Sequence, residues 1–466
     1  MRRALLLVAL AAGCHFLVDP ESIPVPAPTE LVYADASYPV GMAISPNVPS
    51  TRGVPLDTVS SDPPLPLGLG FDDGGAIAGT PLAISPPTTY QVTAANASGS
   101  ADGSVELEVN AGAITSLSAL SAAGDHTCVA TNGERVLCWG DNGLFQLGDG
   151  NNDPARFPVM SAGTGAGLQA VASGDYHTCA IAGGAASCWG TYYDGVPDSG
   201  AWNSSPRAVP GGESGVQAIA AGTNHTCLVA GGGVQCWGAN DLGQLGDGTQ
   251  QWRTAPGAVQ GLPAGATEVA AGTSHTCAVA GGGVQCWGAN AAGQLGDSLD
   301  GGVHVRPFAV SRLPPGVQVL AAGGSHTCAV VDGGAYCWGS NVYGELGIGT
   351  VISTALPTPV RRLASGVTAI ATGESHTCAI ADGGGAWCWG LNDRGQLGGG
   401  AAPFQTDPQP VPGLSSGVQA IAAGASHTCA IVAGGVQCWG DNRLNQLGNG
   451  STAASSGPAP VYFGGP

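Results

Sequence analysis

The sequence predicts an all-β protein in which a propeller of seven repeats follows a smaller, separate unit of short strands. Each repeat reads as about four strands, and a period near 50 residues with several strands per unit is typical of a propeller blade. Fourteen of the 15 cysteines recur with the same period. The repeats are marked by histidines spaced 51, 48, 50, 51, 50 and 51 residues apart, at His126, His177, His225, His275, His326, His376 and His427.

The stretch 275–288 predicts the central hairpin of every repeat. Gly281 and Gly282 can adopt the positive φ angles of a two-residue turn, and short apolar runs flank them. A turn there places Cys277 opposite Cys286 on a non-hydrogen-bonded pair, where the Cα atoms of two strands come closest. That approach suits a cross-strand disulfide.

Seven such disulfides are expected, and they leave only Cys14 without a partner. Zinc sites and redox catalysis are the alternatives, but the short spacing C-x₂₋₄-C and the motif C-x-x-C are both missing. Regularly paired cysteines indicate an oxidising compartment, so the sequence predicts an exported protein. The expected pairs are Cys128 with Cys138, Cys179 with Cys188, Cys227 with Cys236, Cys277 with Cys286, Cys328 with Cys337, Cys378 with Cys388, and Cys429 with Cys438.

The first fourteen residues are typical of an export signal. Two arginines precede an apolar run that is too short to span a bilayer. The run ends in Leu10-Ala11-Ala12-Gly13-Cys14, which resembles the lipobox of bacterial lipoproteins and implies acylation of Cys14. Ala11 stands where that family usually has leucine, so simple cleavage and secretion stay open. We expect an outer-membrane lipoprotein of a bacterial cell envelope, or a secreted protein.

Residues 15–30 are proline-rich and are expected to form a semi-rigid linker. Residues 31–110 lack cysteine and alternate with period two, as at 89–96 and 104–109. The motifs Gly-Leu-Gly-Phe-Asp at 68–72, Gly-Ala-Ile-Ala-Gly-Thr-Pro at 75–81 and Tyr-Gln-Val-Thr-Ala-Ala-Asn at 90–96 resemble bacterial immunoglobulin-like modules related to cadherin-type domains. The resemblance implies a small β-sandwich that serves as a spacer or adhesive unit. Asp72 and Asp73 are consistent with either a calcium site or a turn.

The repeats of residues 111–466 read Gly-Val-Gln-Ala-Ile-Ala-Ala-Gly, His-Thr-Cys, Gly-Gly, Cys-Trp-Gly, Asn-x-x-Gly-Gln-Leu-Gly, a variable loop and a proline-containing strand. This pattern resembles the regulator of chromosome condensation repeat, which implies a seven-bladed propeller. We expect the C-terminal strand at 458–463 to pair into the blade that begins at Ile114, so that both chain ends close the ring.

The repeated residues have structural explanations. Equivalent histidines on seven blades would lie too far apart for zinc bonds of about 2.0 Å, so we expect each imidazole to bond backbone of its own or a neighbouring blade, with no metal and no cofactor. A tryptophan follows each second cysteine and should pack between blades. These are Trp139, Trp189, Trp237, Trp287, Trp338, Trp389 and Trp439.

The Asn-x-x-Gly-Gln-Leu-Gly turn predicts a positive φ angle at Gly243, Gly293, Gly344 and Gly395. Asn445 can substitute for glycine at that position, whereas Phe145 is an awkward occupant. The first blade is therefore expected to bend differently from the others.

Composition excludes several functions. The formal charge is −19, there is no lysine, and no basic stripe offsets the acidity, so nucleic acid is not an expected partner. The zinc-protease motif His-Glu-x-x-His does not occur, and no pair of carboxylates stands out, so we expect no enzymatic activity. Membrane contact is expected only through a lipid anchor at Cys14.

Function is expected in loops that break the repeat, because they carry residue types enriched at binding hot spots. We predict a monomeric, non-enzymatic propeller that binds another protein through these loops, as relatives that include an exchange factor and a β-lactamase inhibitor act by surface contact. Adhesion or binding of a surface glycan is the alternative, a polysaccharide-acting enzyme is less favoured, and aromatics that fill gaps under long loops are the competing explanation. The candidates are Tyr192, Tyr193, Trp202, Trp252, Arg253, His304, Arg306 and Phe404.

Overall fold

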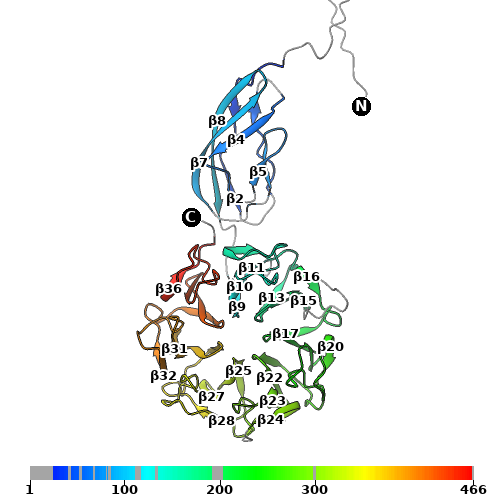
Figure 1. Ribbon diagram of the computed structural model, residues 1–466, viewed down its shortest axis with the longest axis vertical. Helices are drawn as coiled ribbons and strands as arrows, with labels where there is room; N and C mark the ends of the chain where they lie inside the picture. The colour runs from blue at the N-terminus through cyan, green and yellow to red at the C-terminus, as the bar shows by residue number, and fades with distance from the viewer. Residues whose placement is uncertain are drawn as a thin grey trace, which may run out of the picture. The chain divides into compact units, whose positions relative to one another are not determined.

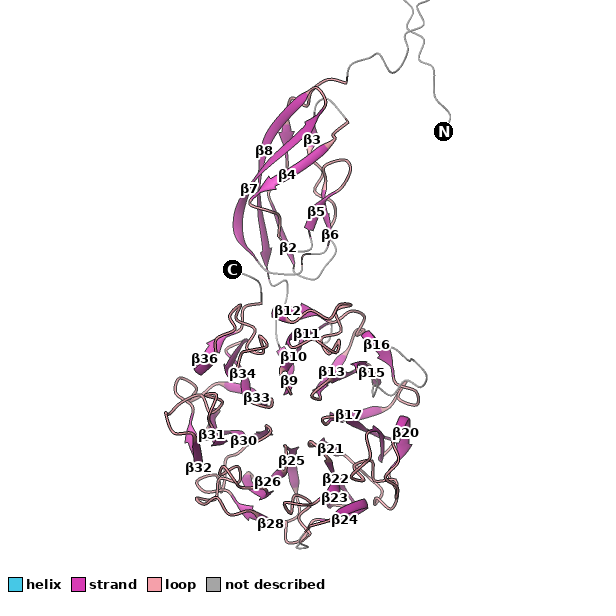
Figure 2. Ribbon diagram, viewed as in Figure 1, coloured by secondary structure: helices cyan, strands magenta, loops and turns pink. Residues whose placement is uncertain are grey.

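The computed structural model describes residues 25–39, 44–51, 55–66, 69–79, 81, 85–110, 117–131, 135–191, 203–297 and 301–463. The chain separates into two compact units, Met1–Gly112 and Ala113–Pro466. The described residues form strands and no helix (Figure 2). None of the described segments is therefore a helix long and apolar enough to cross a membrane.

The first unit is a small β-sandwich, as predicted. Along its long hairpin, Tyr90, Val92 and Ala94 are buried while the residues between them are exposed. Asp72 forms a turn, because its Oδ1 accepts hydrogen bonds from the N–H groups of Gly74 (2.9 Å) and Ala76 (2.8 Å). One sheet has the order β2 (Ala36–Pro39), β8 (Gly99–Asn110), β7 (Ser85–Asn96) and β4 (Thr58–Asp62); β1 (Leu31–Val32) pairs with β3 (Ser50–Thr51), and β5 (Leu69–Phe71) with β6 (Ile77–Gly79).

The second unit is a seven-bladed propeller, as predicted (Figure 1). Each blade is an antiparallel sheet whose strands follow chain order from the axis outward. The blades are β9 (Leu117–Ala123), β10 (His126–Thr131), β11 (Arg135–Gly140), β12 (Ala155–Met160); β13 (Leu168–Ser173), β14 (His177–Ala182), β15 (Ala185–Gly190), β16 (Asn203–Ala208); β17 (Val216–Ala221), β18 (His225–Ala230), β19 (Gly233–Gly238), β20 (Arg253–Ala258); β21 (Glu268–Ala271), β22 (His275–Ala280), β23 (Gly283–Ala289), β24 (Val303–Ala309); β25 (Val317–Ala322), β26 (His326–Val331), β27 (Gly334–Gly339), β28 (Thr354–Pro359); β29 (Ala369–Thr372), β30 (His376–Ala381), β31 (Gly385–Leu391), β32 (Phe404–Pro410); and β33 (Val418–Ala423), β34 (His427–Val432), β35 (Gly435–Gly440), β36 (Ser455–Pro460).

The central hairpin has the predicted register. Ala280 lies opposite Gly283 and Cys277 opposite Cys286. Gly281 and Gly282 adopt φ angles of 61° and 79°, as the two-residue turn requires. The short-range pattern of the sequence is therefore sufficient to determine this pairing.

All seven predicted disulfides are present, and each joins two directly opposed residues of a hairpin with a Cα–Cα distance of 4.1 Å. Every predicted pairing is therefore confirmed. The bridges join Cys128 to Cys138, Cys179 to Cys188, Cys227 to Cys236, Cys277 to Cys286, Cys328 to Cys337, Cys378 to Cys388, and Cys429 to Cys438.

The sulfur atoms of one blade face the tryptophan of the next. Cys227 and Cys236, for example, share a buried cluster with Trp287. The seven tryptophans are fully buried. The expected packing of tryptophan between blades is confirmed.

The predicted mode of ring closure is wrong. β36 pairs with β35 of its own blade, where Gln437 lies opposite Pro460. The outer strand of the first blade is its own β12, where Leu137 lies opposite Met160. Because the proline-containing strand ends each repeat, the segment at 155–160 already completes the first sheet and leaves no position for a strand from the C-terminus.

The expected distortion of the first blade is also wrong. Phe145 adopts a φ angle of 64°, like its glycine counterparts, and its N–H donates to Asn142 O at 2.9 Å. The same bond joins Gly243 N–H to Asn240 O at 3.0 Å in the third blade. The hydrogen bonds of the turn outweigh the local cost of a left-handed phenylalanine, which is about 1–3 kcal/mol.

Candidate functional site

The seven repeated histidines form a closed belt of side-chain hydrogen bonds around the ring. Each imidazole Nε2 lies 2.7–2.9 Å from the Oγ1 of a threonine in the next blade, and each of these groups is fully buried. The pairs are His126–Thr178, His177–Thr226, His225–Thr276, His275–Thr327, His326–Thr377, His376–Thr428 and His427–Thr127. The expected backbone partner was wrong, since the partner is a hydroxyl.

In six of the seven pairs, a backbone carbonyl that accepts the threonine O–H fixes the direction of the bond. Thr276 Oγ1 donates its single proton to Gln244 O (2.9 Å), so His225 Nε2–H must donate to Thr276. Burial lowers the pKa of the seven imidazoles to about 3 or 4, which keeps them neutral. The belt holds neighbouring blades together, and it occupies the Nε2 atom of every one of these histidines with a hydrogen bond. Among the described residues, no group of three or more His, Cys, Asp or Glu side chains could hold a metal ion.

The strand register assigns the loops of every blade to one of two faces. His225 lies opposite Gly238, and Gly238 lies opposite Arg253, so the innermost strand ends where the outermost strand begins. We call this edge of the ring the mouth face. It carries the short loop after each innermost strand and the long loop between the third and fourth strands, while the Gly-Gly turns lie on the opposite face.

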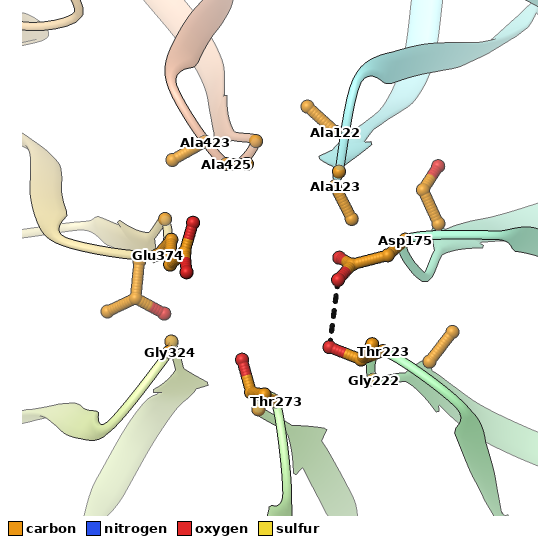
Figure 3. A pocket seen from close by; sticks show the side chains of 18 of the residues that line it. Ala122, Ala123, Asp175, Gly222, Thr223, Thr273, Gly324, Glu374, Ala423 and Ala425 are labelled. Atoms are coloured by element: carbon orange, nitrogen blue, oxygen red, sulfur yellow. Dashed lines mark hydrogen bonds between the residues drawn. The ribbon is translucent and has the colours of Figure 1, made fainter. Parts of the chain in front are cut away.

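An axial hollow of about 410 Å³ opens on the mouth face. Figure 3 shows Asp175 and Glu374 projecting into it from opposite sides. Thr223 Oγ1 donates to Asp175 Oδ2 at 2.9 Å. Burial raises the pKa of Asp175, and burial together with Asp441 and other nearby acids raises the pKa of Asp125. The blades contribute different residues at one position: Gly124, Asp175, Thr223, Thr273, Gly324, Glu374 and Ala425.

The predicted candidates lie near the starts of outer strands and are distributed over separate blades. Trp252 is 50 % exposed, and Arg253 is paired with Asp247 at 3.6 Å. Phe404 is 39 % exposed but belongs to the sixth blade, three blades from Trp252. The structure therefore does not bring these residues together into one site.

The remaining candidates of the fourth blade have partners within the protein. His304 Nε2 lies 3.0 Å from Asp297 Oδ2, and its ring meets Phe308 edge-on at 5.5 Å. The Arg306 guanidinium lies against Gly248 of the third blade. Tyr192, Tyr193, Trp202 and Cys14 lie outside the described residues.

Sequence reasoning missed a patch on the fifth blade. Its turn and long loop expose Val342 (61 %), Tyr343 (40 %), Val351 (47 %) and Ile352 (71 %). We call these four residues the blade-five patch. Beside it a hollow of about 330 Å³ is lined by Val342, Tyr343 and two carboxylates. The available signal was that both variable positions of the Asn-x-x-Gly turn carry large apolar residues, which no other repeat with this turn does.

Comparison with known families identifies both units. The family model described as "RCC1-like domain" matches residues 203–463, more than half of the chain. The model described as "Regulator of chromosome condensation (RCC1) repeat" matches residues 134–181. The model described as "Putative Ig domain" matches residues 24–110. No curated protein sequence matches the chain.

Solved structures with the same propeller fold include Prp20p from Saccharomyces cerevisiae, at 21 % identity and a TM-score of 0.62, covering 75 % of this chain and 88 % of that one. The structure of Kap60 bound to yeast RCC1 (Prp20) gives 21 % and 0.62, with 73 % and 84 % covered. Human WBSCR16 gives 21 % and 0.62, with 70 % and 94 % covered. At this identity the likeness demonstrates the fold.

Proposed function

Since the chain belongs to the RCC1-like domain family, we propose that it is an exported, non-enzymatic propeller that binds a partner protein through its mouth face. The yeast propeller Prp20p is described together with its binding to Gsp1p and histones, all of them proteins. In this chain the repeated residues are used in packing and in the belt, so binding falls to the loops.

One observation carries the proposal: large apolar side chains are exposed in loops of the mouth face. They include Tyr176, Leu242, Tyr343 and Leu444, each 37–40 % exposed. The described hairpin turns of the opposite face consist of glycine, aspartate and alanine. Exposed apolar and aromatic side chains concentrated on one face are typical of a protein interface.

Site-specific cross-linking tests which face binds. A photoreactive amino acid at position 242 or 343 reports from the mouth face, and one at Glu213, exposed on the opposite face, is the matched control. We expect both mouth-face positions to capture the same protein from intact cells, with untagged protein competing and position 213 capturing none. Equal capture from both faces would contradict the proposal.

Export and the lipid anchor form a separate part of the proposal. Seven buried cross-strand disulfides support folding in an oxidising compartment. We propose that Cys14 becomes the acylated N-terminus of an envelope lipoprotein. Metabolic labelling with a fatty acid should mark the wild type and not Cys14→Ser. Labelling of both proteins would contradict acylation at Cys14. Free thiols in non-reducing mass spectrometry would contradict export to an oxidising compartment.

A further inference from the structure

We propose that the blade-five patch and its hollow dock a protein segment that presents one arginine or lysine between apolar residues, with the cationic group seated in the hollow. This inference rests on the proposed function and specifies the chemistry of its partner. It combines an exposed apolar surface with a local charge that selects one kind of occupant.

The apolar part of the site is specific to the fifth blade. Val342 and Tyr343 occupy the two variable positions of the turn, where the fourth blade has Ala291 and Ala292. Asn341 holds the long loop beside this turn, since its Nδ2 donates to Thr350 O (2.9 Å) and Ile352 O (3.0 Å). The turn and the exposed Ile352 therefore belong to one continuous, braced surface.

The base of the hollow carries a carboxylate where other blades have an amide. Glu345 takes the place of the glutamine found in five blades, at Gln146, Gln244, Gln294, Gln396 and Gln446. Glu345 Oε2 accepts the Tyr343 N–H at 2.8 Å, just as Gln244 Oε1 accepts the Leu242 N–H at 2.9 Å. The turn is therefore built equally well by glutamine, and the fold does not require the acid.

A second glutamate, from the sixth blade, lines this hollow as well as the axial hollow. Glu374 stands at the position where the third and fourth blades have Thr223 and Thr273. The lining contains these two glutamates, three serines and no basic side chain. The nearby turn of the sixth blade carries Arg394, which is already paired with Asp393 at 3.6 Å.

Charge complementarity selects the occupant. Glu345 is only 2 % exposed, and burial raises the pKa of its carboxyl, so an incoming cation would replace lost solvation. A guanidinium also stacks on an aromatic ring such as Tyr343 and offers several donors to carboxylate and hydroxyl oxygens. A neutral glycan could pack on the apolar surface but would form no ion pair with either glutamate. An acidic segment would be repelled by both glutamates.

Peptide titration tests the selection with the full-length, oxidised protein. The probe is a fluorescent nonapeptide, GSLVXVLSG, in which X is Arg, Lys, Gln or Glu, measured by anisotropy. We expect the Arg and Lys forms to bind at least about ten-fold more tightly than the Gln form, and the Glu form to bind most weakly. Equal affinity of the Arg and Gln forms overturns the proposal.

Variants locate the effect. E345Q introduces the glutamine that five other blades have at this position, and E374T introduces the threonine that two other blades have. The double variant should therefore fold, with a wild-type melting temperature and seven disulfides. It should lose the preference for Arg while keeping its affinity for the Gln peptide. Y343S/I352S should weaken every peptide. The matched control Q244E adds a carboxylate to the third blade and should change nothing.

Failure of this docking site can be distinguished from failure of the proposed function. Retained Arg preference in E345Q/E374T overturns this docking site even if cross-linking finds a mouth-face partner. Failure to cross-link any protein from the mouth face decides only against the proposed function, because the peptide titration does not depend on the identity of that partner.

Discussion

The contact surface between two neighbouring blades, here called a seam, differs at two places in the ring. Between the seventh and first blades, which no chain segment connects, the tryptophan N–H has its hydrogen-bond partner in the neighbouring blade. Between the second and third blades, which the chain does connect, the corresponding N–H has no partner among the described residues. At the first of these seams, Trp139 Nε1 donates to Gln446 O (2.9 Å), and Thr127 Oγ1 lies 2.8 Å from His427 Nε2. Ala425 N–H also donates to Gly124 O at 2.9 Å.

At the seam between the second and third blades, Trp237 Nε1 has no hydrogen-bond partner within the described part of the chain. The belt continues there through His177 and Thr226 at 2.7 Å. The described buried cluster around Trp237 also contains no leucine from a preceding Gln-Leu-Gly turn, whereas Leu245 packs with Trp287 at the next seam.

The difference teaches that the Gln-Leu-Gly turn adds contacts between blades that chain continuity does not supply. The glutamine carbonyl of this turn accepts both the tryptophan N–H and the threonine O–H of the following blade, as Gln244 O does for Trp287 and Thr276. The second repeat lacks this turn after Trp189, so the following seam lacks that acceptor.

Lowering the pH tests the histidine–threonine belt, which is present at both seams. Of the changes proposed here, it should lower the free energy of unfolding the most. The folded imidazoles have pKa values of about 3 or 4 against 6.5 when unfolded, so the unfolded state binds more protons below pH 6.5. Each histidine should lower the free energy of unfolding by up to about 1.4 kcal/mol per pH unit as pH falls from about 6.5 towards 4. Burial raises the pKa of Asp125, Asp175 and Glu268, which offsets part of this loss.

Denaturant titrations from pH 7 to pH 4.5 measure that slope. His427→Gln and His177→Gln, one at each seam, should reduce it by the same amount, because the belt is intact at both. An unchanged slope in either variant would show that its imidazole is not protonated on unfolding in this range.

Removing a disulfide should rank second. By the loop-entropy model a closed loop of about ten residues stabilises by roughly 2–3 kcal/mol. Cys429→Ala combined with Cys438→Ala removes the bridge that faces Trp139, and Cys179→Ala combined with Cys188→Ala removes the bridge that faces Trp237. Chemical denaturation should give similar losses for the two double variants. A loss confined to one of them would mean that the sulfur–tryptophan packing, and not the cross-link, dominates.

Tryptophan-to-phenylalanine variants measure the missing hydrogen bond directly. Trp139→Phe removes ring volume and the bond to Gln446 O, whereas Trp237→Phe removes volume and no hydrogen bond to any described residue. The first should therefore lower the free energy of unfolding by about 1 kcal/mol more than the second. Equal losses in urea titrations would mean that the two seams are energetically alike.

A glycine in the turn of the seventh blade should have the smallest effect on the free energy of unfolding, and it should raise that energy. Asn445 has a φ of 69° and a buried Oδ1 without a hydrogen-bond partner within the described chain. Asn445→Gly should raise the free energy of unfolding by about 0.5–1 kcal/mol, because glycine adopts this angle freely. The reciprocal Gly395→Asn should be destabilising, since a Cβ there would lie 2.8 Å from Ser456 Cα. A destabilising Asn445→Gly would indicate an unrecognised contact.

The sequence by itself determined the local structure of each blade. Adjacent glycines with flanking apolar runs were sufficient to predict the register of Cys277 and Cys286 and the seven disulfides, because both depend on residues within ten positions of each other. The inter-blade packing of tryptophan and the left-handed position of Gly243 followed from the same short-range periodicity.

Only the tertiary structure decided how the blades join and where a partner can bind. The pairing of β36 within the last blade decided the mode of ring closure. The bond between Thr127 and His427 and the conjunction of Glu345 with Glu374 join residues of different repeats. A repeat pattern states what every blade shares, and so it is silent about which differing residues meet on one face. That meeting depends on how neighbouring blades pack and, between the last and first blades, on closure of the ring across some 300 residues of chain, which local propensity does not encode.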